Sequence, residues 1–420
     1  MMHRLRSALL VVMLLTGCQS QLVLMPTPEV LKDPQFDVFA EHRHPETINQ
    51  IESYYVTTRR PAIAGADFYQ AIPDNQVHYG RTLLQIGKSE QNLLEHLQSP
   101  TQSNKNSLFW TLQDAPQLAS GKRPANSTKT ACATPNAEVL EFLDAMNATL
   151  RDYPVKDLTI YVHGSKNTFY WSVAQGAQYQ FFTGNNAMVL SFSWPSPGSI
   201  WGYAADKLQA DTAATDLACL LELLAAHSDF RRFHLIAYSA GGRVAGGALS
   251  ILGARSHNAS DLRIGQVYLA SSDEPLGRFI ENLPLFYNLV EGLTLTMAEG
   301  DMVLALARFT DKQERLGAPS SKPNDILDKE TETELRAMVH SDRISLIDLS
   351  RSDIEGFQFS HGAWYENPWV STDVMVTLFT GWPPEKRGLA ESLSANGYQF
   401  WYFPKTYLDD LKAALGKNRE

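Results

Sequence analysis

The chain of 420 residues is 44% hydrophobic and 20% charged, with a formal net charge of −10 at pH 7. This composition is typical of a globular protein with a large core. No block rich in lysine or arginine stands out, so nucleic acid is excluded as a partner. At about 150 residues per domain the length allows two or three domains, but many α/β folds of this size form one decorated unit, which we favour.

The first twenty residues combine a basic start, an apolar run at residues 8–15, and small residues just before Cys18. This pattern predicts a secretory signal peptide, because the apolar run is too short to cross a bilayer as a helix. The letters LTGC at residues 15–18 resemble the lipobox of bacterial lipoproteins. That resemblance implies cleavage after residue 17 and acylation of Cys18, and Gln19 resembles the outer-membrane sorting pattern. The alternative is a chance cysteine that ends an ordinary signal or a short anchor.

The expected organisation is a signal peptide at 1–17, a tether at 18–50 and a single α/β domain at 51–420. The tether is expected because residues 19–50 contain proline and glutamine and show little hydrophobic pattern. A lipid-anchored protein of this kind would lie in the cell envelope, at the outer membrane and facing the periplasm. Cys132 and Cys219 could form a disulfide in an exported protein, but Cys219 is equally well explained as a buried residue of a helix.

Strands of β-branched and aromatic residues are predicted at 52–62 and 77–87. Residues 99–136 are rich in Ser, Thr, Asn and Pro, which predicts a long surface excursion. From residue 137 onward, apolar strands alternate with helices; the strands are expected at 158–164, 187–196, 233–239, 264–273, 292–301 and 344–350. Such alternation predicts a mostly parallel central sheet with helices on both faces, preceded by an N-terminal extension.

The letters AYSAG at residues 237–241 place Ser239 at the end of an apolar strand and directly before a glycine-rich helix. A serine at a sharp strand-to-helix turn is the nucleophile elbow, usually written G-x-S-x-G. Ala237 stands in place of the first glycine, and Gly241 in place of the second. Both residues are small enough for strand and helix to approach each other. The alternative is a serine that only caps an ordinary helix.

Catalytic groups in parallel α/β sheets collect at the carboxyl ends of the strands. His361 follows the last apolar strand and is therefore the expected base, whereas His340 precedes that strand. Asp301 and Asp273 each follow a strand and compete as the acid. We favour Asp301 because Asp273 can also be a helix cap, and some hydrolases do take the acid from the earlier position.

Each of these residues has a defined chemical task. His361 would accept the proton of Ser239, and Asp301 would orient the imidazole. Backbone amides must stabilise the oxyanion of the intermediate. The amide of Ala240 follows the nucleophile, and the amide of Ser165 lies in the turn after the strand at 158–164, so these two amides are the expected oxyanion hole.

Several short motifs resemble the α/β-hydrolase superfamily and, within it, a sparsely characterised bacterial branch that is esterase- or lipase-like. They are the letters TTR at 57–59, YGR at 79–81, VHG at 162–164, FSWPS at 192–196, YAAD at 203–206 and YSAG at 238–241. Tyr238 and Ala240 depart from the histidine and methionine that this branch usually carries beside the serine. The resemblance implies an α/β-hydrolase fold and acyl hydrolysis without a metal or cofactor.

Three functions remain open. The first is a membrane-tethered serine hydrolase that cleaves a carboxylic ester, with a small-molecule or lipid ester as substrate. The second is an acyltransferase that uses the same triad, and the third is a binding or scaffold lipoprotein without turnover. The aromatic segments at 169–171, 180–182 and 199–203 could line an acyl pocket or belong to the core. The letters EHRH at 41–44 lack a second ligand cluster, so no metal site is expected.

Overall fold

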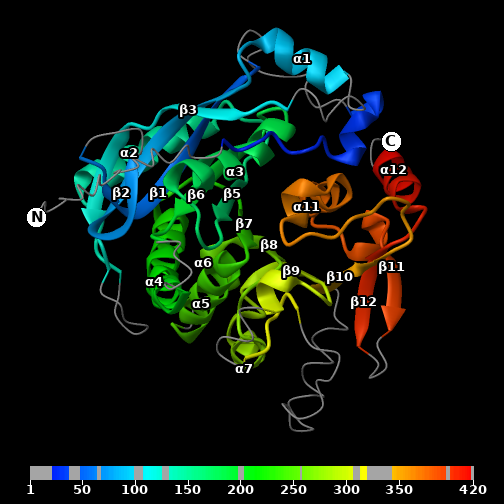
Figure 1. Cartoon of the computed structure of the whole chain (residues 1–420). Coiled ribbons are helices and arrows are strands. Elements are labelled where there is room, and N and C mark those ends of the chain that lie inside the picture. The colour runs from blue at the N-terminus through cyan, green and yellow to red at the C-terminus, as the bar shows by residue number, and fades with distance from the viewer. Residues whose placement is uncertain are drawn as a thin grey trace, which may run out of the picture.

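The structure is a computed structural model that describes residues 21–36, 48–63, 68–98, 107–124, 132–196, 203–255, 258–305, 313–318, 343–393 and 398–417. One twisted sheet of twelve strands runs through the molecule (Figure 1), in the order β11-β12-β10-β9-β8-β7-β5-β6-β1-β2-β3, and β4 pairs with β2. The strands are β1 (Gln50–Pro61), β2 (Tyr69–Ile86), β3 (Trp110–Asp114), β4 (Gln117–Lys122), β5 (Leu158–Val162), β6 (Met188–Ser193), β7 (Phe233–Tyr238), β8 (Ile264–Ala270), β9 (Val290–Met297), β10 (Ile344–Ser352), β11 (Ala390–Leu393) and β12 (Gln399–Phe403).

The body of the sheet is parallel, from β1 through β6, β5, β7, β8, β9 and β10 to β12. Its two ends are antiparallel, because β2 pairs with β1, β3 and β4, and β11 pairs with β12. The predicted α/β fold with a mostly parallel sheet is therefore confirmed. The carboxyl ends of the parallel strands lie at one edge of the sheet, where catalytic groups are expected.

Helices cover both faces of the sheet (Figure 1), as the sequence predicts. One face carries α2 (Ala137–Leu150), α4 (Tyr203–His227), α5 (Ala240–Ala254), α6 (Ala259–Leu262) and α7 (Leu276–Phe286). The other carries α3 (Phe169–Phe182) and α11 (Pro368–Thr380). The remaining helical segments are α1 (Glu90–Gln98), α10 (Ala363–Glu366), α12 (Tyr407–Lys417), η1 (Glu29–Lys32), η2 (Pro34–Phe36) and η6 (Pro384–Arg387).

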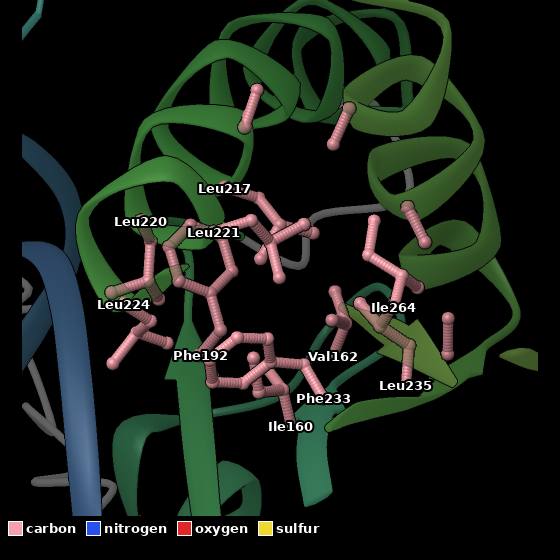
Figure 2. Packing of buried hydrophobic residues seen from close by; sticks show 14 of the residues in the cluster. Ile160, Val162, Phe192, Leu217, Leu220, Leu221, Leu224, Phe233, Leu235 and Ile264 are labelled. Atoms are coloured by element: carbon pink, nitrogen blue, oxygen red, sulfur yellow. The ribbon is translucent and has the colours of Figure 1, made fainter. Parts of the chain in front are cut away.

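Alternation along the central strands builds a core on each face. In β5, Ile160 and Val162 pack with α4, while Tyr161 packs with α3 on the other face. Figure 2 shows the first of these cores, in which the leucines of α4 lie above Ile160, Val162 and Phe192. Side chains of successive strand residues point to opposite faces, so a continuous apolar strand is what a sheet covered on both sides requires.

The predicted surface excursion at 99–136 is wrong for part of its length. Residues 110–114 form β3 and residues 117–122 form β4, and both strands pair with β2. Trp110 is fully buried and packs edge-on against Phe181 of α3. Strand pairing at the end of the sheet thus overrides the polar composition of the segment, because the backbone groups of a polar strand gain partners in the sheet.

The predicted tether at 18–50 is also wrong where the structure describes it. Residues 21–36, which we call the N-terminal strap, lie along α3, β3, α11 and α12. The amide of Leu24 donates to Leu108 O at 2.7 Å, and the amide of Met25 donates to Gln178 Oε1 at 2.6 Å. Leu22, Leu24, Met25 and Val30 are all buried. Four apolar side chains in a segment of low periodicity are enough to bind it to the core.

Cys132 and Cys219 form a disulfide, with 5.5 Å between the two Cα atoms, which decides the pairing that the sequence left open. The bond links the segment before α2 to the middle of α4. Near it, Arg123 forms an ion pair with the buried carboxylate of Asp216, also on α4. None of the helices in the described ranges is both long enough and apolar enough to cross a bilayer.

Candidate active site

Ser239 occupies the turn between β7 and α5, with φ 54° and ψ −120°. A positive φ is costly for a residue with a side chain, so surrounding contacts must hold it. The amide of Ser239 donates to Ala270 O at 2.9 Å, and its carbonyl accepts from Asp273 N at 3.0 Å. At Gly241 a Cβ would lie 2.2 Å from Val162 O, which explains why this position after the serine is a glycine. The predicted elbow geometry is therefore present at Ser239.

Ser239, His361 and Asp301 lie in one hydrogen-bonded chain. His361 Nε2 lies 2.9 Å from Ser239 Oγ, and His361 Nδ1 lies 2.7 Å from Asp301 Oδ2. Ser239 follows β7, Asp301 follows β9, and His361 lies in the loop after β10, so three strand ends bring them together. A neutral imidazole that donates from Nδ1 to the carboxylate can accept the serine proton at Nε2.

The two candidate acids have different partners. The other carboxylate oxygen of Asp301 accepts from the amides of Val303 and Leu304, at 3.0 and 3.1 Å, so this side chain is fixed in place. The carboxylate of Asp273 instead lies 2.8 Å from Arg315 Nε, and both of these side chains are buried. Asp301 is therefore the aspartate in contact with His361, and Asp273 belongs to an ion pair.

The turn after β5 lies directly against the serine. A Cβ at Gly164 would lie 3.0 Å from Ser239 Cβ, so Gly164 lies against the serine. Ser165 is the next residue in this turn. The turn is fixed, because the amide of Lys166 donates to Ser196 Oγ at 2.8 Å. Ala240 is the first residue of α5, where amides lack an acceptor within the helix. Both predicted oxyanion amides thus belong to segments that meet at Ser239.

His163 precedes this turn and contacts its backbone. Its ring is fully buried and stacks on Trp194 with 5.1 Å between centroids, and its Nδ1 lies 2.7 Å from Gly164 O. Arg59 of β1 reaches His163 Nε2 at 3.3 Å and donates to Asn167 O at 2.7 Å. Burial, together with the charge of Arg59, lowers the pKa of His163 to about 3, so the ring is neutral at pH 7.

Residues 140–378 match the model of a protein family described as alpha/beta hydrolase of unknown function (DUF900). The match covers more than half of the chain. The chain belongs to this family. No curated protein matches it. The matched range includes Ser239, Asp301 and His361, so the hydrogen-bonded chain of these residues lies within the family's common region.

In this α/β-hydrolase, a group of aromatic side chains borders His361. This group was not predicted from the sequence. The ring of Tyr238 lies 5.2 Å from that of His361, and Trp364 and Tyr365 lie 5.5 and 6.2 Å from Tyr238. Trp364 also stacks on Tyr161 and Tyr179. We call Tyr238, Trp364 and Tyr365 the aromatic wall. The sequence does carry a signal for it, since the letters WY at 364–365 follow His361 after only two residues.

Four of the aromatic residues that the sequence offered for an acyl pocket lie elsewhere in the fold. Phe169, Phe181 and Phe182 are buried in the core between α3 and the sheet, and Tyr170 donates from its hydroxyl to Trp110 O at 2.7 Å. Residues 199–202 of the third segment lie outside the described residues. So do the signal peptide at 1–17, Cys18 and the EHRH segment at 41–44.

One group of side chains in the described part of the chain has the spacing of metal ligands. It consists of Cys132, Cys219 and Glu222. Because its two sulfur atoms are joined in the disulfide, they are not available as thiolate ligands. The group is therefore a structural link between α4 and the segment before α2.

Proposed function

We propose that this protein is a serine hydrolase that cleaves a carboxylic ester through an acyl-enzyme. One observation carries the proposal: Ser239, in a strained turn, contacts His361 at 2.9 Å, and His361 contacts Asp301 at 2.7 Å. A serine hydroxyl is a weak nucleophile until a base removes its proton, and this arrangement supplies that base. Membership of an α/β-hydrolase family supports hydrolysis as the reaction class.

In the first half-reaction, His361 takes the proton of Ser239 as Oγ bonds to the ester carbonyl carbon. The tetrahedral intermediate then loses its alcohol, which leaves with the proton held on His361. In the second half-reaction His361 takes a proton from water, and the resulting hydroxide attacks the acyl carbon. Ser239 Oγ leaves and recovers the proton, so the products are one acid and one alcohol. Asp301 keeps the imidazole oriented and stabilises its positive charge throughout.

The oxyanion of each intermediate would accept hydrogen bonds from the amides of Ala240 and Ser165. Removal of one such donor in other hydrolases costs roughly 3 kcal/mol of transition-state stabilisation. The fixed turn at Gly164 matters here because donors that are already in place need no reorganisation during the reaction. The half-buried rings of Tyr238 and Tyr365 beside His361 favour an ester with an apolar acyl or alcohol group.

The decisive experiment uses the full chain and a Ser239→Ala variant. The wild type should label with a fluorophosphonate and hydrolyse short-chain p-nitrophenyl esters, and the variant should do neither. An unlabelled and inactive wild type would favour the scaffold function. If an added alcohol accelerates release of p-nitrophenol and yields a new ester, the protein is an acyltransferase with the same triad.

We further propose that residues 1–17 are removed and that Cys18 is acylated, which would hold the single domain at the outer membrane on its periplasmic side. The disulfide supports export, because such bonds persist in oxidising compartments and are rare in the cytosol. Mass spectrometry of the native protein should find an N-terminal Cys18 that carries acyl chains. An unmodified first residue or a cut at another position would contradict this part.

A further inference from the structure

We propose that the edge of the sheet formed by the N-terminal strap and β3 rests directly on the lipid bilayer, so that the protein has one fixed orientation there. The inference depends on the proposed acylation of Cys18. Only three peptide units separate Cys18 from Gln21, and an extended chain of that length spans at most about 11 Å. A longer tether would allow the domain to rotate freely above the membrane, but the position of the strap excludes such a tether.

The strap is bound to the fold from its first described residues. The amide of Leu22 donates to the hydroxyl of Tyr170 at 2.9 Å, and the amide of Trp110 donates to Leu22 O at 2.9 Å. Leu22 is 2% exposed. The chain therefore leaves the lipid and enters the body of the protein within four residues. The surface around Leu22 must consequently lie next to the bilayer.

That surface has the composition that a bilayer requires. Val23 and Phe109 face each other in an antiparallel bridge, and their side chains are 43% and 40% exposed. Residues 21–28 of the strap and residues 107–113, the part of this edge around Leu22, include no charged residue; the charged residues that follow these stretches along the chain are Glu29 and Asp114. Exposed edge strands usually carry charges that prevent pairing with other chains. An uncharged stretch with an apolar pair, whose Val23 lies five residues after the cysteine proposed to be lipidated, is better explained by contact with lipid.

The orientation restricts which esters reach the site. Five strand spacings of about 4.8 Å separate β3 from β7 in the sheet order, so Ser239 stands on the order of 24 Å from β3 across the sheet. Phospholipids that remain in the bilayer would not reach the serine. The proposed substrate class is therefore an ester dissolved in the aqueous phase or carried by a molecule that projects from the membrane.

The test uses the acylated mature protein, from Cys18 onward, in vesicles of phosphatidylcholine and phosphatidylglycerol, in which part of the phosphatidylcholine carries a quencher on its acyl chain. A fluorophore on Phe109→Cys is compared with one on Leu393→Cys. Leu393 is a matched control, because it is an apolar residue, 62% exposed, on β11 at the opposite end of the same sheet. We expect quenching by about half or more at position 109 and none at position 393. Equal signals, or stronger quenching at position 393, would overturn the orientation.

The same experiment separates this inference from the proposals on which it depends. Acylation is read by mass spectrometry and by sedimentation with the vesicles, and its absence overturns both the anchor and the orientation. The labelled variants are also made with Ser239→Ala, since loss of turnover should leave the quenching unchanged. A dimer that Val23→Lys dissolves, with no quenching at position 109, would show that a second copy of the chain covers this edge instead.

Discussion

Two histidine–aspartate pairs lie at opposite edges of the sheet and differ in what surrounds them. At the carboxyl edge, His361 bonds to Asp301 through Nδ1 and leaves Nε2 to Ser239. At the amino edge, His234 Nε2 lies 3.3 Å from Asp157, and His234 Nδ1 accepts from the amide of Gln266 at 2.9 Å. Both nitrogens of His234 are thus engaged within the protein. A histidine–aspartate pair becomes a candidate catalytic unit only where one nitrogen faces a nucleophile.

The aspartates of the two pairs also differ in charge environment. Burial disfavours the carboxylate of Asp157, but hydrogen bonds from His234, Arg231 and Arg232 outweigh that cost and hold its pKa far below the usual range. The carboxylate of Asp301 accepts instead from His361 and from two backbone amides. The first of these aspartates therefore belongs to a charge network, whereas Asp301 belongs to the proposed proton path.

The largest expected difference between the two pairs is the effect on kcat of replacing the aspartate by asparagine. Asp301→Asn should lower kcat about 10⁴-fold, because the amide favours the wrong tautomer of His361. Asn keeps an oxygen for the amides of Val303 and Leu304, so the fold should survive. Asp157→Asn should leave kcat within about twofold, since no reacting group is near it. Hydrolysis of p-nitrophenyl acetate by both variants measures this, and equal losses would contradict the assignment.

Asp273 provides a second comparison with Asp301. It follows β8, and Asp301 follows the neighbouring strand β9. Asp273→Asn should lower the free energy of unfolding by about 3 kcal/mol, since it weakens a buried ion pair with Arg315. The kcat of the folded variant should stay near that of the wild type. Urea denaturation and active-site titration give the two quantities. Loss of turnover here but not in Asp301→Asn would show that Asp273 is the catalytic acid.

Asp157→Asn should cost less stability, about 2 kcal/mol at pH 7, because it removes charge-assisted hydrogen bonds that are partly exposed. The pKa of Asp157 is depressed in the folded state, so its contribution is present above the unfolded value of about 4 and is lost as the pH falls below it. The stability difference between wild type and variant should therefore shrink below about pH 4. Denaturation curves over pH 2–7 test the sign, and a difference that grows in acid would contradict it.

A third histidine has the smallest effect at pH 7, because it changes the free energy of unfolding only in acid. The unfolded state takes up a proton at His163 below about pH 6.5, whereas the folded state does not until about pH 3. His163 should therefore lower stability by about 1.4 kcal/mol per pH unit as the pH falls through this range. His163→Gln should lack this slope. An NMR titration should find the ring neutral down to about pH 3, and protonation near pH 6 would refute the burial argument.

The parts of the fold that follow local rules could be predicted from the sequence. Continuous apolar strands such as 158–162 and the small residues around Ser239 depend only on neighbours in the chain, and both were predicted. The strap could not be, because its partners Trp110, Gln178 and Thr372 lie far away in the sequence. Neither could β3 and β4, whose polar residues become strands only because β2 lies beside them.

The choice between the two acids shows a similar limit within the site. Asp273 and Asp301 both follow apolar strands, so their positions in the sequence do not decide which of them contacts His361. Arg315, which pairs with Asp273, comes 42 residues later in a segment with no regular pattern. Distant partners of this kind decide side-chain roles, and a single sequence does not reveal them. The aromatic wall was missed for another reason, since Trp364 and Tyr365 looked like ordinary apolar residues after His361.

The N-terminal strap also determines how the protein can be shortened. Val30 donates from its amide to Thr372 of α11 at 3.4 Å, and Asp33 pairs with Lys412 of α12 at 2.7 Å. A soluble form that began near residue 50 would uncover the apolar surface under Leu22, Leu24 and Met25 and would remove an acceptor from the Trp110 amide. Aggregation of such a truncated protein would say nothing about its catalytic competence. Under the proposed acylation of Cys18, a secreted form without lipid is better obtained by replacement of Cys18 alone, with every residue from Gln19 onward retained.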